Sequence, residues 1–271
     1  MRALRPVLAC IPLFLLAAAP ALSAPALMPH RAVYDLVLED SSDRSGITGL
    51  TGRMVYEFDG SACEGYTTTF RFVTRIETDE MSRLSDIQTS SYEDGEGKNF
   101  SFVSKSFVDE KPEKEVKGRA RIDGEGTEVT LERPESRTLR LDRTMFPTQH
   151  MLDLIGRAKA QETFYETTIF DASEDADRLM TTTVVVGKKA PVASGDPERA
   201  AMGDLAGEQF WPVDMAYFDL SSGDEIPSYR ISFKLHEGGL TRDLVMDYGD
   251  FSMKGTLVEL TKLPPAEACG R

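Results

Sequence analysis

Side chains that alternate between apolar and polar constrain the fold of this chain more than any other feature. The clearest case is the segment 66–76, where one face of an extended chain carries Tyr66, Phe70, Phe72 and Ile76. The other face carries threonine and arginine side chains. This period of two is typical of a half-buried antiparallel strand. Because strands and helices do not alternate along the chain, a parallel sheet is disfavoured.

The same alternation, bounded by Gly- and Asp-rich turns, predicts about fourteen strands. They cover residues 31–38, 52–58, 66–76, 86–92, 99–107, 115–122, 127–131, 137–141, 163–169, 179–187, 210–218, 228–234, 241–248 and 251–260. In the last of these the apolar phase switches near Gly255, which indicates a β-bulge or a sharp bend. Such bends let long strands curl. We therefore expect an all-β-dominated fold, a single antiparallel β-spiral or open barrel with one or two packed helices.

One segment, 148–160, is predicted to be a helix. Met151, Leu154, Ile155 and Ala158 recur at helical spacing and form an apolar stripe. The stripe fits a helix packed on the sheet, and it also fits a plug or lid over a barrel mouth. The polar segment 188–203 is interpreted as a surface loop.

The N-terminal residues are typical of a secretory signal peptide. Arg2 and Arg5 precede an apolar run at 7–19, and small residues cluster at 17–26. The run contains Pro12 and is shorter than the roughly 20 residues of a membrane span. We expect residues 1–24 to be removed, with an approximate cleavage site, and residues 25–271 to form one domain in the periplasm.

The chain is acidic, with a formal net charge of −14 at pH 7. Nucleic acids and anionic lipid surfaces repel a chain of this charge. Nucleic-acid binding is therefore not expected.

Cysteine is scarce, and each of the three residues needs an explanation. Cys10 would be lost with the signal peptide. Cys63 and Cys269 would then be the two cysteines of an exported protein, where oxidising conditions favour a disulfide. A catalytic cysteine is disfavoured, because no histidine lies near Cys63 in a recognisable motif, and no paired Cys or His has the spacing of metal ligands.

Motifs of catalysis are missing from the sequence. It contains no Gly-x-Ser-x-Gly nucleophile elbow and no glycine-rich phosphate-binding motif. The acidic run 171–177 lacks the glycine and the terminal glutamate of an EF-hand loop and is interpreted as a solvated turn. We therefore expect no catalytic residues, no metal and no cofactor.

A curled sheet with one apolar helix favours binding, because larger barrels enclose ligand cavities. The candidates for the cavity wall are Phe70, Phe72, Phe102, Met151, Leu154, Ile155, Trp211, Tyr217, Tyr229 and Phe233. The alternative is that these side chains simply fill the core.

Several stretches resemble the EipB family of cell-envelope-integrity proteins of the Gram-negative periplasm. They are HRAVYDLVL, CEGY, FPTQHMLDLIGRA, IFDAS, WPVDMAYFD, IPSYRISFKLHEGG, MDYGDFSMKGTLVEL and LPPAEAC. The resemblance spans the predicted mature chain in order. It implies a β-spiral of about fourteen strands with an apolar cavity, a disulfide between Cys63 and Cys269, and a non-enzymatic role in the cell envelope. The sequence departs from the family at two positions. Ala172 stands in Phe170-Asp171-Ala172, where the family has Phe-Asp-Gly, and Tyr56 stands where tryptophan is common.

Two functions of different kinds follow from this pattern. The first is a periplasmic protein that supports envelope integrity and binds a peptide, or an extended segment of another envelope protein, in its cavity. The second is a lipid or lipoprotein carrier of the lipoprotein-localisation type, which predicts a wall made almost wholly of aliphatic and aromatic side chains. An envelope hydrolase is a third, less favoured hypothesis.

Overall fold

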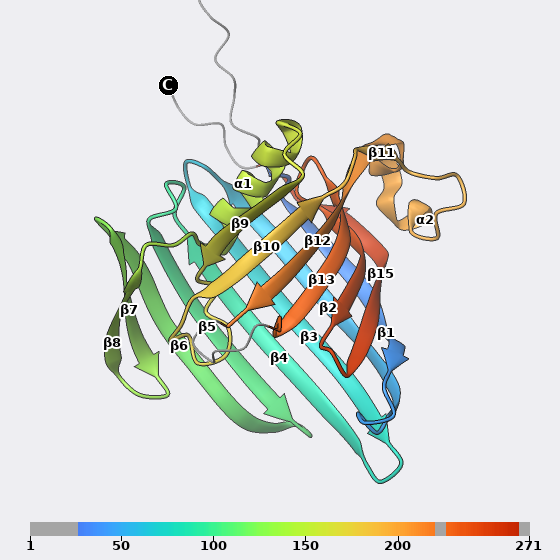
Figure 1. The fold of residues 1–271 in the computed structure, drawn as a ribbon, viewed down its shortest axis with the longest axis horizontal. Helices are drawn as coiled ribbons and strands as arrows, with labels where there is room; N and C mark the ends of the chain where they lie inside the picture. Colours follow the sequence, from blue (N-terminus) through green and yellow to red (C-terminus); the bar gives the residue numbers. More distant parts are fainter. Residues whose placement is uncertain (1–26, 220–225, 266–271) are drawn as a thin grey trace, which may run out of the picture.

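The computed structural model describes residues 27–219 and 226–265. Nearly all of its regular structure belongs to one antiparallel sheet (Figure 1). The strands are β1 (His30–Ser41), β2 (Ile47–Ser61), β3 (Gly65–Thr78), β4 (Ser82–Glu93), β5 (Asn99–Val108), β6 (Lys111–Asp123), β7 (Gly126–Arg133), β8 (Arg137–Asp142), β9 (Phe164–Ile169), β10 (Met180–Val186), β11 (Ala190–Pro191), β12 (Gln209–Phe218), β13 (Tyr229–His236), β14 (Thr241–Asp247) and β15 (Phe251–Lys262). The all-β prediction is confirmed, and the additional strand is the two-residue β11.

Two meanders meet in the middle of this sheet. Strands β1 to β8 run outward as successive neighbours, and β9 to β15 return from the opposite edge, with β11 beside β12. β1 and β15 are therefore partners at the centre, and β8 and β9 form the two edges. The sheet curls so that β9, β10, β12 and β13 cross over β3, β4 and β5 (Figure 1).

An irregularity in the β1–β15 ladder explains part of the curl. Val33 pairs with Glu259 and Tyr34 with Leu257, so Val258 is an extra residue in β15 and is 42% exposed. The phase switch predicted near Gly255 thus lies three residues further on. Gly255 remains in register, and a Cβ there would lie 3.2 Å from the side chain of Leu36 and 3.3 Å from that of Leu244. Because residue 255 has no side chain, β15 can approach the neighbouring strands closely at this point.

Helix α1 (Pro147–Lys159) connects β8 to β9 and lies at one end of the curled sheet (Figure 1). It begins one residue before the predicted helix, because Pro147 suits the first helical position, where its missing N–H needs no partner. Leu154, Ile155 and Ala158 are buried, as the apolar stripe predicts. In the described part of the chain, no helix has the length and apolar character needed to span a membrane.

Buried side chains form two clusters. The larger joins the curled strands to α1 and includes Leu154, Trp211 and Leu257. The smaller lies under β5 to β7 and includes the rings of Phe100, Phe102, Phe146 and Phe170. The Phe100 and Phe146 ring centroids are 5.2 Å apart, so aromatic packing fixes the chain that leads into α1.

Candidate functional site: an amphipathic cavity

A cavity of about 780 Å³ lies between the two layers of the curled sheet and α1. Pockets that hold ligands in proteins generally measure about 300–1,000 Å³. It has four distinct regions: a hydroxyl wall, an aromatic wall and two polar ends.

The hydroxyl wall follows the inward face of three neighbouring strands. Period-two alternation points every second residue into the cavity. The hydroxyl side chains that line it there are Thr68 on β3, Ser85, Thr89 and Ser91 on β4, and Ser104 and Ser106 on β5. Thr89 and Ser104 lie opposite each other, and their hydroxyl oxygens are 3.1 Å apart. This face presents hydrogen-bonding groups inside the molecule.

The aromatic wall lies across the cavity on β12 and β13. Tyr217 and Tyr229 are paired across the two strands and stack with their ring centroids 4.3 Å apart. Met215 continues this wall along β12. Burial raises the pKa of both tyrosines well above the usual value, so both remain neutral.

The end of the cavity beside α1, which we call the helix end, is organised by Glu93. Its carboxylate accepts hydrogen bonds from the backbone N–H groups of Thr148, at 2.8 Å, and Gln149, at 2.9 Å. Phe146, the N-cap residue, provides no side-chain bond, so a glutamate from β4 caps the helix instead. Burial raises the pKa of Glu93 to about 7, although these two N–H groups act in the opposite direction.

His150 also lines the helix end and is only 5% exposed. Its Nε2 has no hydrogen-bond partner. Burial lowers the pKa of His150 to about 4, so the ring is neutral near pH 7. A neutral imidazole with an unused nitrogen can donate to or accept from a guest.

The opposite end, which we call the charged end, is formed by Glu113, Lys114 and residues 171–174. Lys114 Nζ lies 2.7 Å from the carboxylate of Asp175 and donates to the backbone carbonyl of Glu174 at 2.9 Å. Ala172 has a φ of 59°, so alanine here keeps a left-handed conformation that favours glycine. Glu174 is exposed in a turn, as the solvated-turn interpretation of 171–177 predicts, whereas Asp171 is half-buried and also lines the cavity.

Six of the ten candidate wall residues line this cavity. They are Phe70, Phe102, Met151, Leu154, Tyr217 and Tyr229. The structure places Phe72, Ile155, Trp211 and Phe233 in the packed interior outside the cavity. Trp211, for example, shares a strand face with Tyr217 but lies further along β12, where Lys189 Nζ is 4.3 Å from the centroid of its ring. Periodicity shows which face points inward but does not show how far along a strand a cavity reaches.

Sequence reasoning missed the hydroxyl wall, Glu93, His150 as a wall residue, and Asp171. The signal for the wall was the spacing of Ser85, Ile87, Thr89, Ser91 and Glu93, which share one face of β4. Polar residues on a strand face are normally assigned to solvent, and here that face borders a cavity.

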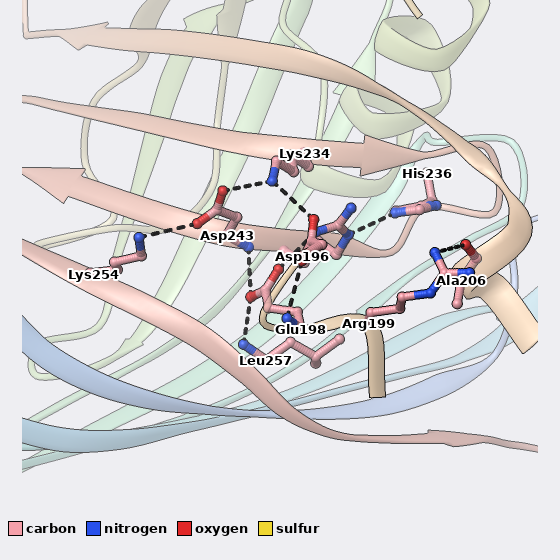
Figure 2. Close-up of polar contacts among 10 residues, drawn as sticks. Asp196, Glu198, Arg199, Ala206, Lys234, His236, Asp243, Lys254 and Leu257 are labelled. Atoms are coloured by element: carbon pink, nitrogen blue, oxygen red, sulfur yellow. Dashed lines mark hydrogen bonds and ion pairs between the residues drawn. The ribbon is translucent and has the colours of Figure 1, made fainter. Parts of the chain in front are cut away.

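A second polar group is a buried ionic cluster of Asp196, Glu198, His236 and Arg242, of which Figure 2 labels the first three. Arg242 is fully buried, and its Nη1 donates to both carboxylates at 2.9 Å. Its Nε donates to His236 Nε2 at 3.0 Å. Burial, followed by the charge of Arg242, lowers the pKa of His236 to about 4.

The buried ionic cluster joins three parts of the fold. The second carboxylate oxygen of Glu198 accepts backbone N–H groups from Asp243 on β14, at 3.0 Å, and Leu257 on β15, at 2.7 Å (Figure 2). No member of the cluster lines the cavity. Its contacts connect residues 196–198 to β14 and β15, which gives the cluster a structural role.

The surface-loop interpretation of 188–203 is wrong for the residues that enter this cluster. The side chains of Asp196 and Glu198 are only 3% and 1% exposed. The segment also contains β11 and the short helix α2 (Arg199–Met202), which leads into the 3₁₀ helix η1 (Gly203–Gly207). The charge on Arg242 draws the two carboxylates inward, an effect that local polarity does not reveal.

Cys63 lies in the turn between β2 and β3. Its predicted partner, Cys269, and the predicted signal peptide lie outside the described residues, so both remain predictions. Among residues 27–219 and 226–265, no group of three or more His, Cys, Asp or Glu side chains is arranged to hold a metal ion.

Comparison with known proteins identifies relatives along most of the chain. The family model described as EipB-like matches residues 21–264. A cell envelope integrity protein, EipB of Brucella abortus (strain 2308), is 57% identical over 245 residues, which are 90% of this chain and 87% of that protein. The crystal structure of a beta-barrel-like protein from Brucella abortus, a domain of unknown function, is similar with a TM-score of 0.85 and 56% identity. It covers 89% of this chain and 100% of its own. The chain therefore belongs to the EipB-like family.

Proposed function

We propose that this chain is a non-enzymatic protein of the periplasm that supports cell-envelope integrity by binding a peptide, or an extended segment of another envelope protein, in its cavity. The envelope role is supported by the name of the Brucella abortus relative, with which the chain shares 57% identity. The periplasmic location is supported by the signal-peptide pattern of the N-terminal residues.

The amphipathic wall carries the peptide part of this proposal. One side of the cavity presents hydroxyl groups interspersed with apolar side chains such as Phe70, Ile87 and Phe102, and the other presents the stacked rings of Tyr217 and Tyr229. A peptide matches both, because its backbone carbonyl and N–H groups can bond the hydroxyls while its side chains pack on the rings. An acyl chain would cover the hydroxyls without bonding them, and each hydroxyl left without any partner in that way costs about 1–3 kcal/mol. The wall therefore supports a lipid carrier less well.

The test is to fill the cavity with a large side chain introduced on the hydroxyl wall. Ser104→Phe places a ring in the middle of this wall, whereas Ser101→Phe adds the same ring to the exposed face of the same strand. Native mass spectrometry of each variant purified from the periplasm should show peptide-mass adducts on the wild type and on Ser101→Phe. These adducts should be absent from Ser104→Phe.

Two outcomes would contradict the proposal. Peptide adducts that persist on Ser104→Phe would place the peptide outside the cavity. Adducts of lipid mass that disappear in Ser104→Phe would support the lipid carrier instead.

A further inference from the structure

The charges at the charged end of the cavity are unbalanced. Glu113 is 3.3 Å from Arg83, and Lys114 is occupied by Asp175. Asp171 accepts one hydrogen bond, from the backbone N–H of Ser173 at 2.9 Å, and neither Asp171 nor Glu174 forms an ion pair with any described residue. The cavity wall thus offers the half-buried carboxylate of Asp171 without a counterion, with the exposed carboxylate of Glu174 at its edge, and it offers no unpaired cation among the described residues.

The negative charge of Asp171 affects the two tyrosines of the aromatic wall. After burial, its negative charge is the largest factor that raises the pKa of Tyr217, and it also raises that of Tyr229. All three side chains line the cavity. A carboxylate beside aromatic rings is a favourable environment for a cation, because the ring faces and the carboxylate attract positive charge together.

The buried imidazole of His150 is an independent sign that the cavity holds a guest. It lies at the helix end, is 5% exposed and has an unpartnered Nε2. Buried polar atoms in folded proteins nearly always have a partner. A guest that spans the cavity would supply this partner at the helix end.

From these observations we propose that the cavity selects a basic guest: a peptide segment whose lysine or arginine side chain lies at the charged end, beside Asp171 and the Tyr217–Tyr229 pair. This inference rests on the proposed function and adds the charge of the guest. A guest with a carboxylate or phosphate group would meet two carboxylates of like charge, and their repulsion would weaken its binding.

Three matched peptides test the inference by isothermal titration calorimetry. Each is N-acetylated and C-amidated with the sequence Ser-Leu-Ser-Leu-Xaa, where Xaa is Lys, Gln or Glu. We expect the Lys peptide to bind about tenfold more tightly than the Glu peptide, with the Gln peptide between them. The preference should shrink as the salt concentration rises.

Variants assign the preference to Asp171. Asp171→Asn keeps the side-chain oxygen that accepts the Ser173 N–H and removes the charge, so the Lys preference should fall to about twofold. Asp142→Asn removes one charge from the exposed face of β8, away from the cavity, and should leave the preference unchanged.

The results separate this inference from the proposed function. Equal binding of the Lys and Glu peptides, or tighter binding of the Glu peptide, would overturn the basic guest and leave peptide binding intact. An unchanged preference in Asp171→Asn would overturn the role of Asp171. If none of the three peptides bound, the proposed function itself would fail, and the charge selection would fail with it.

Discussion

Glu93 should make the stability of this protein depend on pH in a direction unusual for a carboxylate. Burial raises its pKa from 4.5 to about 7. Because the folded state holds the Glu93 proton more tightly than the unfolded chain does, the contribution to stability is complete below pH 4.5 and is lost as the pH rises through 7. At about 1.4 kcal/mol per pKa unit the full effect is about 3 kcal/mol, of which about 2 kcal/mol falls between pH 5 and pH 8.

Glu93→Gln isolates this effect. The amide keeps one oxygen for the backbone N–H groups of Thr148 and Gln149 but cannot titrate. It should therefore lower the free energy of unfolding by about 1–2 kcal/mol at pH 5, and this loss should disappear by pH 8, where the wild type no longer has the contribution of protonated Glu93. Urea denaturation at pH 5 and at pH 8 gives the change in the free energy of unfolding between the two pH values for each protein. The decrease from pH 5 to pH 8 should be about 2 kcal/mol larger in the wild type than in Glu93→Gln.

The control is Glu125→Gln, which removes an exposed glutamate in the turn between β6 and β7 and should retain the wild-type pH dependence. The reasoning is refuted if Glu93→Gln shows the same change from pH 5 to pH 8 as the wild type. It is also refuted if the wild type gains stability relative to the variant as the pH rises.

Two further predictions concern the covalent and ionic connections of the fold. Arg242→Met leaves the carboxylates of Asp196 and Glu198 buried without their cation, so the free energy of unfolding in urea should fall by about 3–5 kcal/mol. Arg230→Met breaks an exposed pair with Asp214 and should cost less than about 1 kcal/mol; equal losses in the two variants would contradict a structural role for the buried ionic cluster. For the predicted disulfide, intact mass after iodoacetamide treatment should show no label at Cys63 or Cys269 unless the protein is first reduced. A label acquired without reduction would exclude the pairing.

The parts of the fold that local periodicity specifies could be predicted from the sequence. The alternation from Tyr66 to Ile76 predicts β3, and the spacing of Leu154, Ile155 and Ala158 predicts α1. Both patterns record which side chains face the interior, and burial of that face is what stabilises each element. The strands, α1 and the curled antiparallel sheet were therefore predictable, even though the order in which the strands pair was not.

The parts of the site that depend on distant partners could not be predicted. Glu93 caps α1 across 55 residues of sequence, and Glu198 bonds the backbone of Leu257 across 59. Neither residue carries a local signal for its role, because an isolated glutamate in a polar segment is ordinarily solvated. The hydroxyl wall was missed for a related reason, since serine on a strand face indicates water unless the sheet is known to curl over it.

The central position of the β1–β15 ladder has a consequence for how the chain is made. Strands β1 to β8 can pair with their sequence neighbours as they emerge, but the second partner of β1 is the last strand of the sheet. Until β15 is synthesised, β1 presents an unpaired backbone edge, and unpaired edges are templates for aggregation. Vulnerability during synthesis is therefore concentrated on a strand that is central, and fully protected, in the finished protein.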